Sequence, residues 1–217
     1  MGRDSKTVFS YLYPMHLILI TPDTKVNNEL QIINSLFANG LQRLHVRKPG
    51  FSYEEYKAYI SNIDAQYYKH IVVCGAFELY IEMGLGGVHL NSHMRNDDTV
   101  WARIKHIPLA HISTSFHSWQ EVRDNERPYG YVFISPVFDS ISKAGYKAAI
   151  DLQQCAAVRQ GVIAKDGYCP QIMGLGGVGV PQVNVLQECG FDGAGLLGSV
   201  WRAEDVVGAF VEILRSV

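Results

Sequence analysis

The sequence has no apolar run long enough to cross a membrane and no cysteine spacing typical of a metal site. A membrane-spanning helix needs roughly 18 or more consecutive apolar residues, and no stretch of this chain reaches that length. The four cysteines, Cys74, Cys155, Cys169 and Cys189, form no Cys-x-x-Cys pair, which argues against zinc and against a disulfide framework. No small-residue cleavage pattern follows the N-terminus, so we expect no signal peptide. The simplest interpretation is a reduced, cytoplasmic protein without a membrane partner.

Charge is also sparse, and it is balanced. Charged residues make up 18% of the chain and the formal net charge is −2, so no basic field indicates nucleic-acid binding. Apolar residues make up 47% of the 217 residues, which is enough for one sizeable core. No linker or low-complexity segment divides the chain, so we expect a single domain over 1–217, with 1–12 as a loose leader. A homo-oligomer is compatible with this composition.

Short apolar runs typical of β-strands alternate with segments of helical spacing along the whole chain. The run 16–21, for example, precedes helical spacing over 25–38, which ends at Asn39-Gly40. Eight such units can be counted, with expected strands at 16–21, 42–46, 70–73, 87–90, 109–113, 131–134, 171–173 and 193–197. Alternation of this kind gives parallel strands with right-handed crossovers. It predicts a single (β/α)8 TIM barrel, with an open doubly wound sheet as the alternative.

The stretch 171–200 contains two apolar runs that end in glycine. The first ends in Gly174-Leu175-Gly176-Gly177, and the second in Gly198-Ser199. In a β/α barrel, the loops after strands 7 and 8 commonly hold a phosphate group, because free backbone N–H groups can converge there on an anion. The alternative is that these glycines only make tight turns. From this stretch alone, both interpretations stay open.

Further polar residues follow the other expected strands, where β/α barrels carry their chemistry. Arg47 follows strand 2, and Ser140, Ser142 and Lys143 follow strand 6. Cations and hydroxyls grouped at one rim suit a phosphorylated small molecule. Taken singly, Arg47 and Lys143 are more simply explained as exposed loop charges, and it is their shared position that favours binding.

Histidines offer the candidate acid–base chemistry. His117 follows strand 5 and precedes Ser118, the expected cap of the next helix. An imidazole there can act as a general acid or base near neutral pH, although a lone histidine is more often structural. His89 lies inside an expected strand, which favours a structural role, and His93 is expected on a surface loop.

Together these motifs resemble the thiamine phosphate synthase superfamily, which also contains the thiazole tautomerases of the TenI type. The resemblance runs from about 17 to 214 and rests on the segments 45–49, 86–90, 113–118, 135–143, 173–178 and 193–199. It implies a TIM-barrel enzyme of thiamine biosynthesis with a small-molecule thiazole phosphate as its partner. It also implies that the phosphate and other anionic groups lie against Arg47, Ser140, Ser142, Lys143, Gly176, Gly177, Gly198 and Ser199.

The chain departs from the synthase pattern where the synthase holds Mg²⁺. Hard oxygen ligands must hold that ion against a diphosphate leaving group. The Asn-Asp pair of the family falls on Cys74-Gly75, and its second acidic ligand falls near Met94. The Gln and Lys that flank the arginine of the family are His45 and Pro49 here, with Lys48 as a candidate replacement for the latter.

Three hypotheses follow from this resemblance. The first is a metal-free thiazole tautomerase without a cofactor, in which His117 moves the proton. The alternative is a thiamine phosphate synthase that joins hydroxymethylpyrimidine diphosphate to thiazole phosphate and releases pyrophosphate, with Mg²⁺ displaced to Asp23, Asp97 or Asp139. The third is a catalytically silent protein that binds thiazole or thiamine phosphate.

Overall fold

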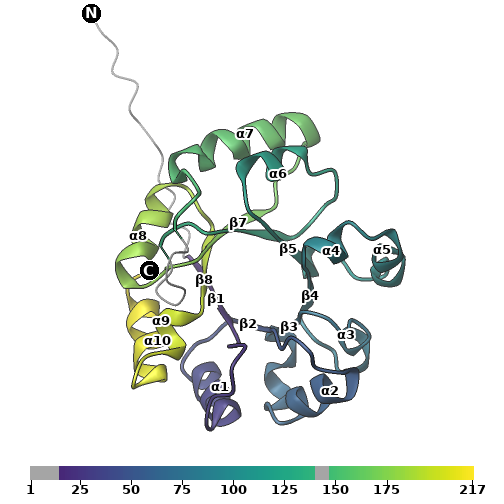
Figure 1. Ribbon diagram of the computed structural model, residues 1–217, viewed down its shortest axis with the longest axis vertical. Coiled ribbons are helices and arrows are strands. Elements are labelled where there is room, and N and C mark those ends of the chain that lie inside the picture. The colour runs from purple at the N-terminus through teal and green to yellow at the C-terminus, as the bar shows by residue number, and fades with distance from the viewer. Residues whose placement is uncertain (1–14, 140–146) are drawn as a thin grey trace, which may run out of the picture.

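A computed structural model describes residues 15–139 and 147–217. The strands form one closed, parallel barrel in sequence order, and β8 pairs with β1 to complete it (Figure 1). The strands are β1 His16–Ile20, β2 Arg43–Val46, β3 Ile71–Val73, β4 Gly87–Leu90, β5 Ile112–Phe116, β6 Tyr131–Ile134, β7 Gln171–Leu175 and β8 Gly193–Leu196. The predicted TIM barrel is confirmed, and the open doubly wound sheet is wrong.

Helices surround the barrel on its outside (Figure 1). The α-helices are α1 Glu29–Ala38, α2 Tyr53–Ser61, α3 Leu79–Glu82, α4 Ser92–Arg95, α5 Asp98–Ile104, α6 Trp119–Asp124, α7 Cys155–Asp166, α8 Val180–Glu188, α9 Gly198–Trp201 and α10 Val206–Arg215. Three 3₁₀ helices, η1 Ala65–His70, η2 Leu109–His111 and η3 Leu152–Gln154, complete the described elements. Within these ranges, no helix is long and apolar enough to cross a membrane.

Strand 5 lies three residues further along the chain than the sequence predicted. The expected strand 109–113 begins as the 3₁₀ turn Leu109–His111, and β5 runs from Ile112 to Phe116. Leu109 is 49% exposed, whereas the polar Ser113 and Thr114 are buried, and their hydroxyls donate to the carbonyls of Val88 and Leu90. Satisfied hydroxyls therefore take the place of apolar side chains in this strand.

The core has two parts because successive strand residues face opposite sides of the barrel wall. Leu17 and Leu19 of β1 face outward and belong to the large cluster that packs between barrel and helices. Ile18 faces inward and packs with Tyr131, Phe133 and Met173. The inner cluster is small, so polar side chains occupy part of the barrel interior and form the site described next.

Candidate active site

A cavity of about 600 Å³ opens at the carboxyl ends of the strands, where the sequence predicted the chemistry. Its walls come from β1 to β7 and the loops that follow them. Among the described residues its lining includes Arg47, Cys74, Gly75, His45, His89, Asn91, Ser92, Met94, Ser115, His117, Phe133, Ser135 and Leu175. Arg47 and His117, predicted from positions after separate strands, are thus brought to one cavity.

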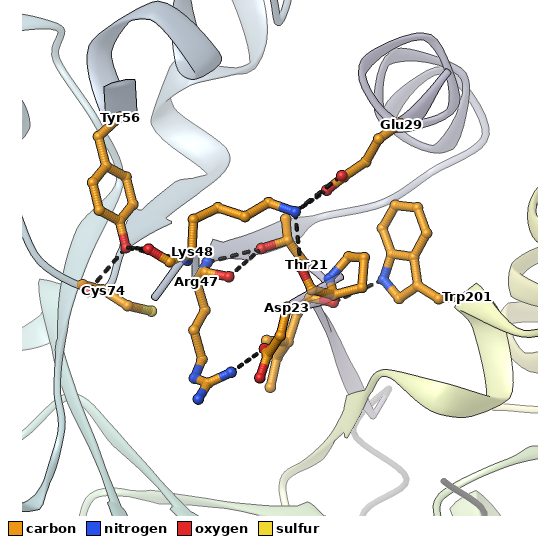
Figure 2. Close-up of polar contacts among 10 residues, drawn as sticks. Thr21, Asp23, Glu29, Arg47, Lys48, Tyr56, Cys74 and Trp201 are labelled. Atoms are coloured by element: carbon orange, nitrogen blue, oxygen red, sulfur yellow. Dashed lines mark hydrogen bonds and ion pairs between the residues drawn. The ribbon is translucent and has the colours of Figure 1, made fainter. Parts of the chain in front are cut away.

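Arg47 is held in place through its backbone. The Thr21 hydroxyl accepts from the Arg47 N–H at 2.9 Å and donates to the Arg47 carbonyl at 3.0 Å, so one buried side chain satisfies both groups. The guanidinium forms an ion pair with Asp23 and its side chain is 48% exposed (Figure 2). A cation fixed at its base and open at its tip can exchange a weak surface ion pair for an anionic ligand.

Lys48 follows Arg47 in sequence, but its ammonium extends toward α1 (Figure 2). Its Nζ lies 2.7 Å from Glu29 Oε1 and donates to the Pro22 carbonyl at 2.8 Å, with the side chain only 6% exposed. Tyr59 donates its hydroxyl to the same carboxylate. Lys48 is among the residues that line the cavity, but its ammonium is engaged by this buried ion pair, which disfavours it as the replacement anion ligand.

Two imidazoles lie on the inner wall of the cavity. His45 Nε2 lies 2.6 Å from the Tyr131 hydroxyl. The His89 ring lies between the hydroxyls of Ser113, 2.9 Å from Nδ1, and Ser115, 3.2 Å from Nε2. The ring centroids of the two histidines are 5.1 Å apart. Burial, and then the neighbouring His89, lower the pKa of His45.

Burial, followed by the charge of Arg47, lowers the pKa of His89 to about 4, so both rings are neutral at pH 7. The sequence favoured a structural role for His89, and His45 appeared only as a departure from the synthase pattern. The available signal was strand alternation: in β2, Leu44 and Val46 face the helices, which turns Arg43 and His45 inward.

His117 follows β5 directly and its ring lines the cavity. Its Nδ1 lies 3.1 Å from the Ser135 carbonyl oxygen at the end of β6. The Ser135 hydroxyl lies 3.3 Å from the same nitrogen. The carbonyl oxygen can only accept, so its contact favours the tautomer with the proton on Nδ1, in which Nε2 carries a lone pair. An imidazole in this tautomer can act as a general base through Nε2.

The turns after β7 and β8 lie beside each other. A Cβ built on Gly179 would lie 3.8 Å from the Cβ of Ser199. The Ser199 hydroxyl is buried and has no hydrogen-bond partner within the described ranges, and a buried polar atom of this kind calls for a ligand or a water. These turn residues lie outside the lining of the cavity itself, and their predicted phosphate stays a prediction. Ser140, Ser142 and Lys143 lie outside the described residues.

The close packing of the turn after β7 can be tested at Gly177. Its φ is +67°, and a Cβ there would lie 2.3 Å from the Asp139 carbonyl oxygen. Gly167 has φ +70° with nothing within 4 Å, so Gly167→Ala carries only the left-handed backbone penalty of about 1–2 kcal/mol. We expect Gly177→Ala to lose about 1–3 kcal/mol more through overpacking, measured by urea unfolding. Equal losses in both variants would contradict the close approach.

The described residues at this cavity do not fit a magnesium ion. No Asp or Glu is among the residues that line it, and no group of three or more His, Cys, Asp or Glu in 15–139 and 147–217 could hold a metal. Burial raises the pKa of Cys74 to about 12, so its thiol stays protonated.

The carboxylates suggested for a displaced site have other partners. Asp23 pairs with Arg47, Asp97 caps α5 by accepting from the Thr99 N–H, and Asp139 accepts from the Ala148 N–H at 2.7 Å. Each of these contacts engages one oxygen of the carboxylate, Oδ1, which Mg²⁺ bound there would have to share or avoid.

A closed barrel with a polar cavity at the carboxyl ends of its strands is typical of TIM-barrel enzymes. Residues 17–200 match the family described as Thiamine monophosphate synthase. The chain belongs to this family, which includes the TenI proteins, and is therefore a protein of thiamine biosynthesis.

The relatives agree with this assignment. A thiamine-phosphate synthase of Bacillus thuringiensis subsp. konkukian is 22% identical over 224 residues, covering 100% of this chain and 98% of the relative. A solved thiamine phosphate pyrophosphorylase of Bacteroides thetaiotaomicron is 30% identical with a TM-score of 0.72, covering 93% and 97%. One from Pyrococcus furiosus, 17% identical with a TM-score of 0.73 over 94% and 95%, supports the fold.

Proposed function

We propose that this chain is a thiazole tautomerase that isomerises a thiazole carboxylate phosphate by proton transfer. The observation that carries the proposal is the His117 imidazole, which lines the cavity while its Nδ1 contacts the Ser135 carbonyl. In the Nδ1–H tautomer that the carbonyl favours, Nε2 is the proton acceptor. Acid–base catalysis of this kind contributes about 10²–10⁴-fold to a rate.

The reaction balances with one imidazole. His117 Nε2 takes a proton from the saturated ring carbon, and the electron pair shifts into the ring as the exocyclic double bond is lost. The same imidazolium returns the proton to the exocyclic carbon, so the ring becomes aromatic with no net change in atoms or charge. The Ser135 carbonyl, 3.1 Å from Nδ1, accepts from the Nδ1–H of the transient imidazolium and stabilises it. Arg47 would orient the carboxylate.

The second candidate is the synthase reaction, and the names of the relatives favour it. Both the curated relative from Bacillus and the solved structure from Bacteroides carry synthase names. Against it stands the donor set of the cavity, which supplies no carboxylate among the described lining residues. The names of the similar proteins alone would rank the synthase first, whereas the residues of the cavity lead us to rank the tautomerase first.

A pair of assays on the purified chain separates the candidates. In the first, the thiazole carboxylate tautomer is added and its aromatisation is followed by absorbance, with and without EDTA. In the second, hydroxymethylpyrimidine diphosphate and thiazole phosphate are added with Mg²⁺ and pyrophosphate is measured. We expect EDTA-insensitive acceleration in the first and no pyrophosphate in the second. Pyrophosphate release without aromatisation would select the synthase, and binding without either reaction would select a silent protein.

A further inference from the structure

We propose that Arg95 and Glu121 form a positioning pair that sets the place and orientation of the His117 imidazole. The inference rests on the proposed function, since it concerns the base of that reaction. Arg95 ends α4 and Glu121 lies in the first turn of α6, so neither residue belongs to the strand that precedes His117. Neither lines the cavity described above.

Arg95 contacts two consecutive residues at the end of β5. Its Nη1 donates to the Ser115 carbonyl, and its guanidinium carbon lies 4.6 Å from the centre of the Phe116 ring. The side chain is only 12% exposed. The indole N–H of Trp101 donates to the Arg95 carbonyl at 2.9 Å and fixes the backbone from which this side chain extends.

Glu121 extends the contact to the third residue. Its Oε2 accepts from Arg95 Nη2 at 2.8 Å and from the backbone N–H of His117 at 3.3 Å. The Glu121 N–H in turn donates to the Ser118 hydroxyl, which caps α6. Residues 115, 116 and 117 are therefore all held from one side by a single charged pair.

His117 is thus attached at two points. The Arg95–Glu121 pair holds its backbone, and the Ser135 carbonyl holds its ring at Nδ1. Removing the first attachment leaves a largely buried guanidinium without its carboxylate and lets the backbone of His117 shift. A misplacement of about 1 Å in a reacting group can cost about 100-fold in rate, so this pair acts through His117 without touching the substrate.

The kinetic test compares Glu121→Ala and Glu121→Gln with a matched pair elsewhere. Arg103 forms an ion pair with Glu78 and lies 6.0 Å from the Phe77 ring centre, so Glu78→Ala removes a similar contact away from His117. We expect Glu121→Ala to lower kcat for aromatisation about 10- to 100-fold, with KM within about two-fold of the wild type. Glu121→Gln should recover part of that loss in kcat. Glu78→Ala should match the wild type in both constants. A raised KM with unchanged kcat would overturn the proposal.

A second measurement does not depend on activity. In protein labelled with ¹⁵N-histidine, we expect the wild-type His117 ring to give the shifts of a single Nδ1–H tautomer, assigned by their loss in His117→Asn. Glu121→Ala is expected to give averaged shifts. Wild-type ring shifts in Glu121→Ala would overturn the positioning role. If the wild type shows no aromatisation at all, the proposed function fails, while this measurement still decides whether the pair orders the ring.

Discussion

His117→Ala is expected to lower kcat for thiazole aromatisation by about 10²–10⁴-fold, the usual contribution of a general acid–base residue. The reason is local: the imidazole that lines the cavity is removed, while Arg47 stays held by Thr21. KM should change little, because in this scheme His117 moves the proton and other groups bind the anions. The measurement is steady-state aromatisation by absorbance at saturating and limiting substrate.

The control for this variant is His93→Ala. His93 is exposed on α4, outside the cavity lining, so its loss removes an imidazole without touching the site. We expect wild-type kcat there. A His117→Ala enzyme that keeps the wild-type rate would contradict the proposed mechanism, whatever group then moves the proton. In the synthase assay, wild-type protein that releases pyrophosphate would contradict it independently.

The fold could be read from the sequence because buried parallel strands leave unbroken apolar runs between helical segments. The predicted position of strand 5 was wrong for a physical reason. The strand was predicted three residues too early because Leu109 is apolar yet exposed, and Ser113 and Thr114 are polar yet buried. A hydroxyl paired with a carbonyl on the next strand is invisible to hydropathy.

The candidate site could likewise be predicted only in part from the sequence. Arg47 and His117 were found because a barrel brings the residues after each strand to one face. The buried partner of Lys48 could not be found, because Glu29 lies 19 residues away on another element. The contacts of Arg95 with Ser115, Phe116 and Glu121 likewise join residues 20 to 26 positions apart. Sequence pattern gives the face on which a residue lies, whereas its partners depend on how loops pack.

The largest expected change in stability belongs to the Lys48–Glu29 pair behind the cavity. Both side chains are less than 10% exposed, at 6% and 9%. Glu29→Gln keeps the shape of the side chain but leaves the Lys48 ammonium buried without a negative partner. Breaking a buried ion pair from one side costs about 3–5 kcal/mol. We expect a loss of this size in the free energy of unfolding by urea.

The matched comparison is the Arg103–Glu78 pair, whose side chains are 57% and 53% exposed. Glu78→Gln should cost less than about 1 kcal/mol, because water screens exposed ion pairs. A double variant, Glu29→Gln with Lys48→Met, removes both buried charges and should recover much of the loss.

Equal losses in Glu29→Gln and Glu78→Gln would contradict the buried pair. The Lys48–Glu29 pair is also expected to affect substrate binding at the site. Lys48 joins the loop after β1, through the Pro22 carbonyl, to the segment after β2 that carries Arg47. Loss of the Lys48–Glu29 ion pair in Glu29→Gln should therefore weaken the binding of anionic substrate groups at Arg47, which would be seen as a raised KM. Because kcat depends on His117, it should stay near the wild-type value.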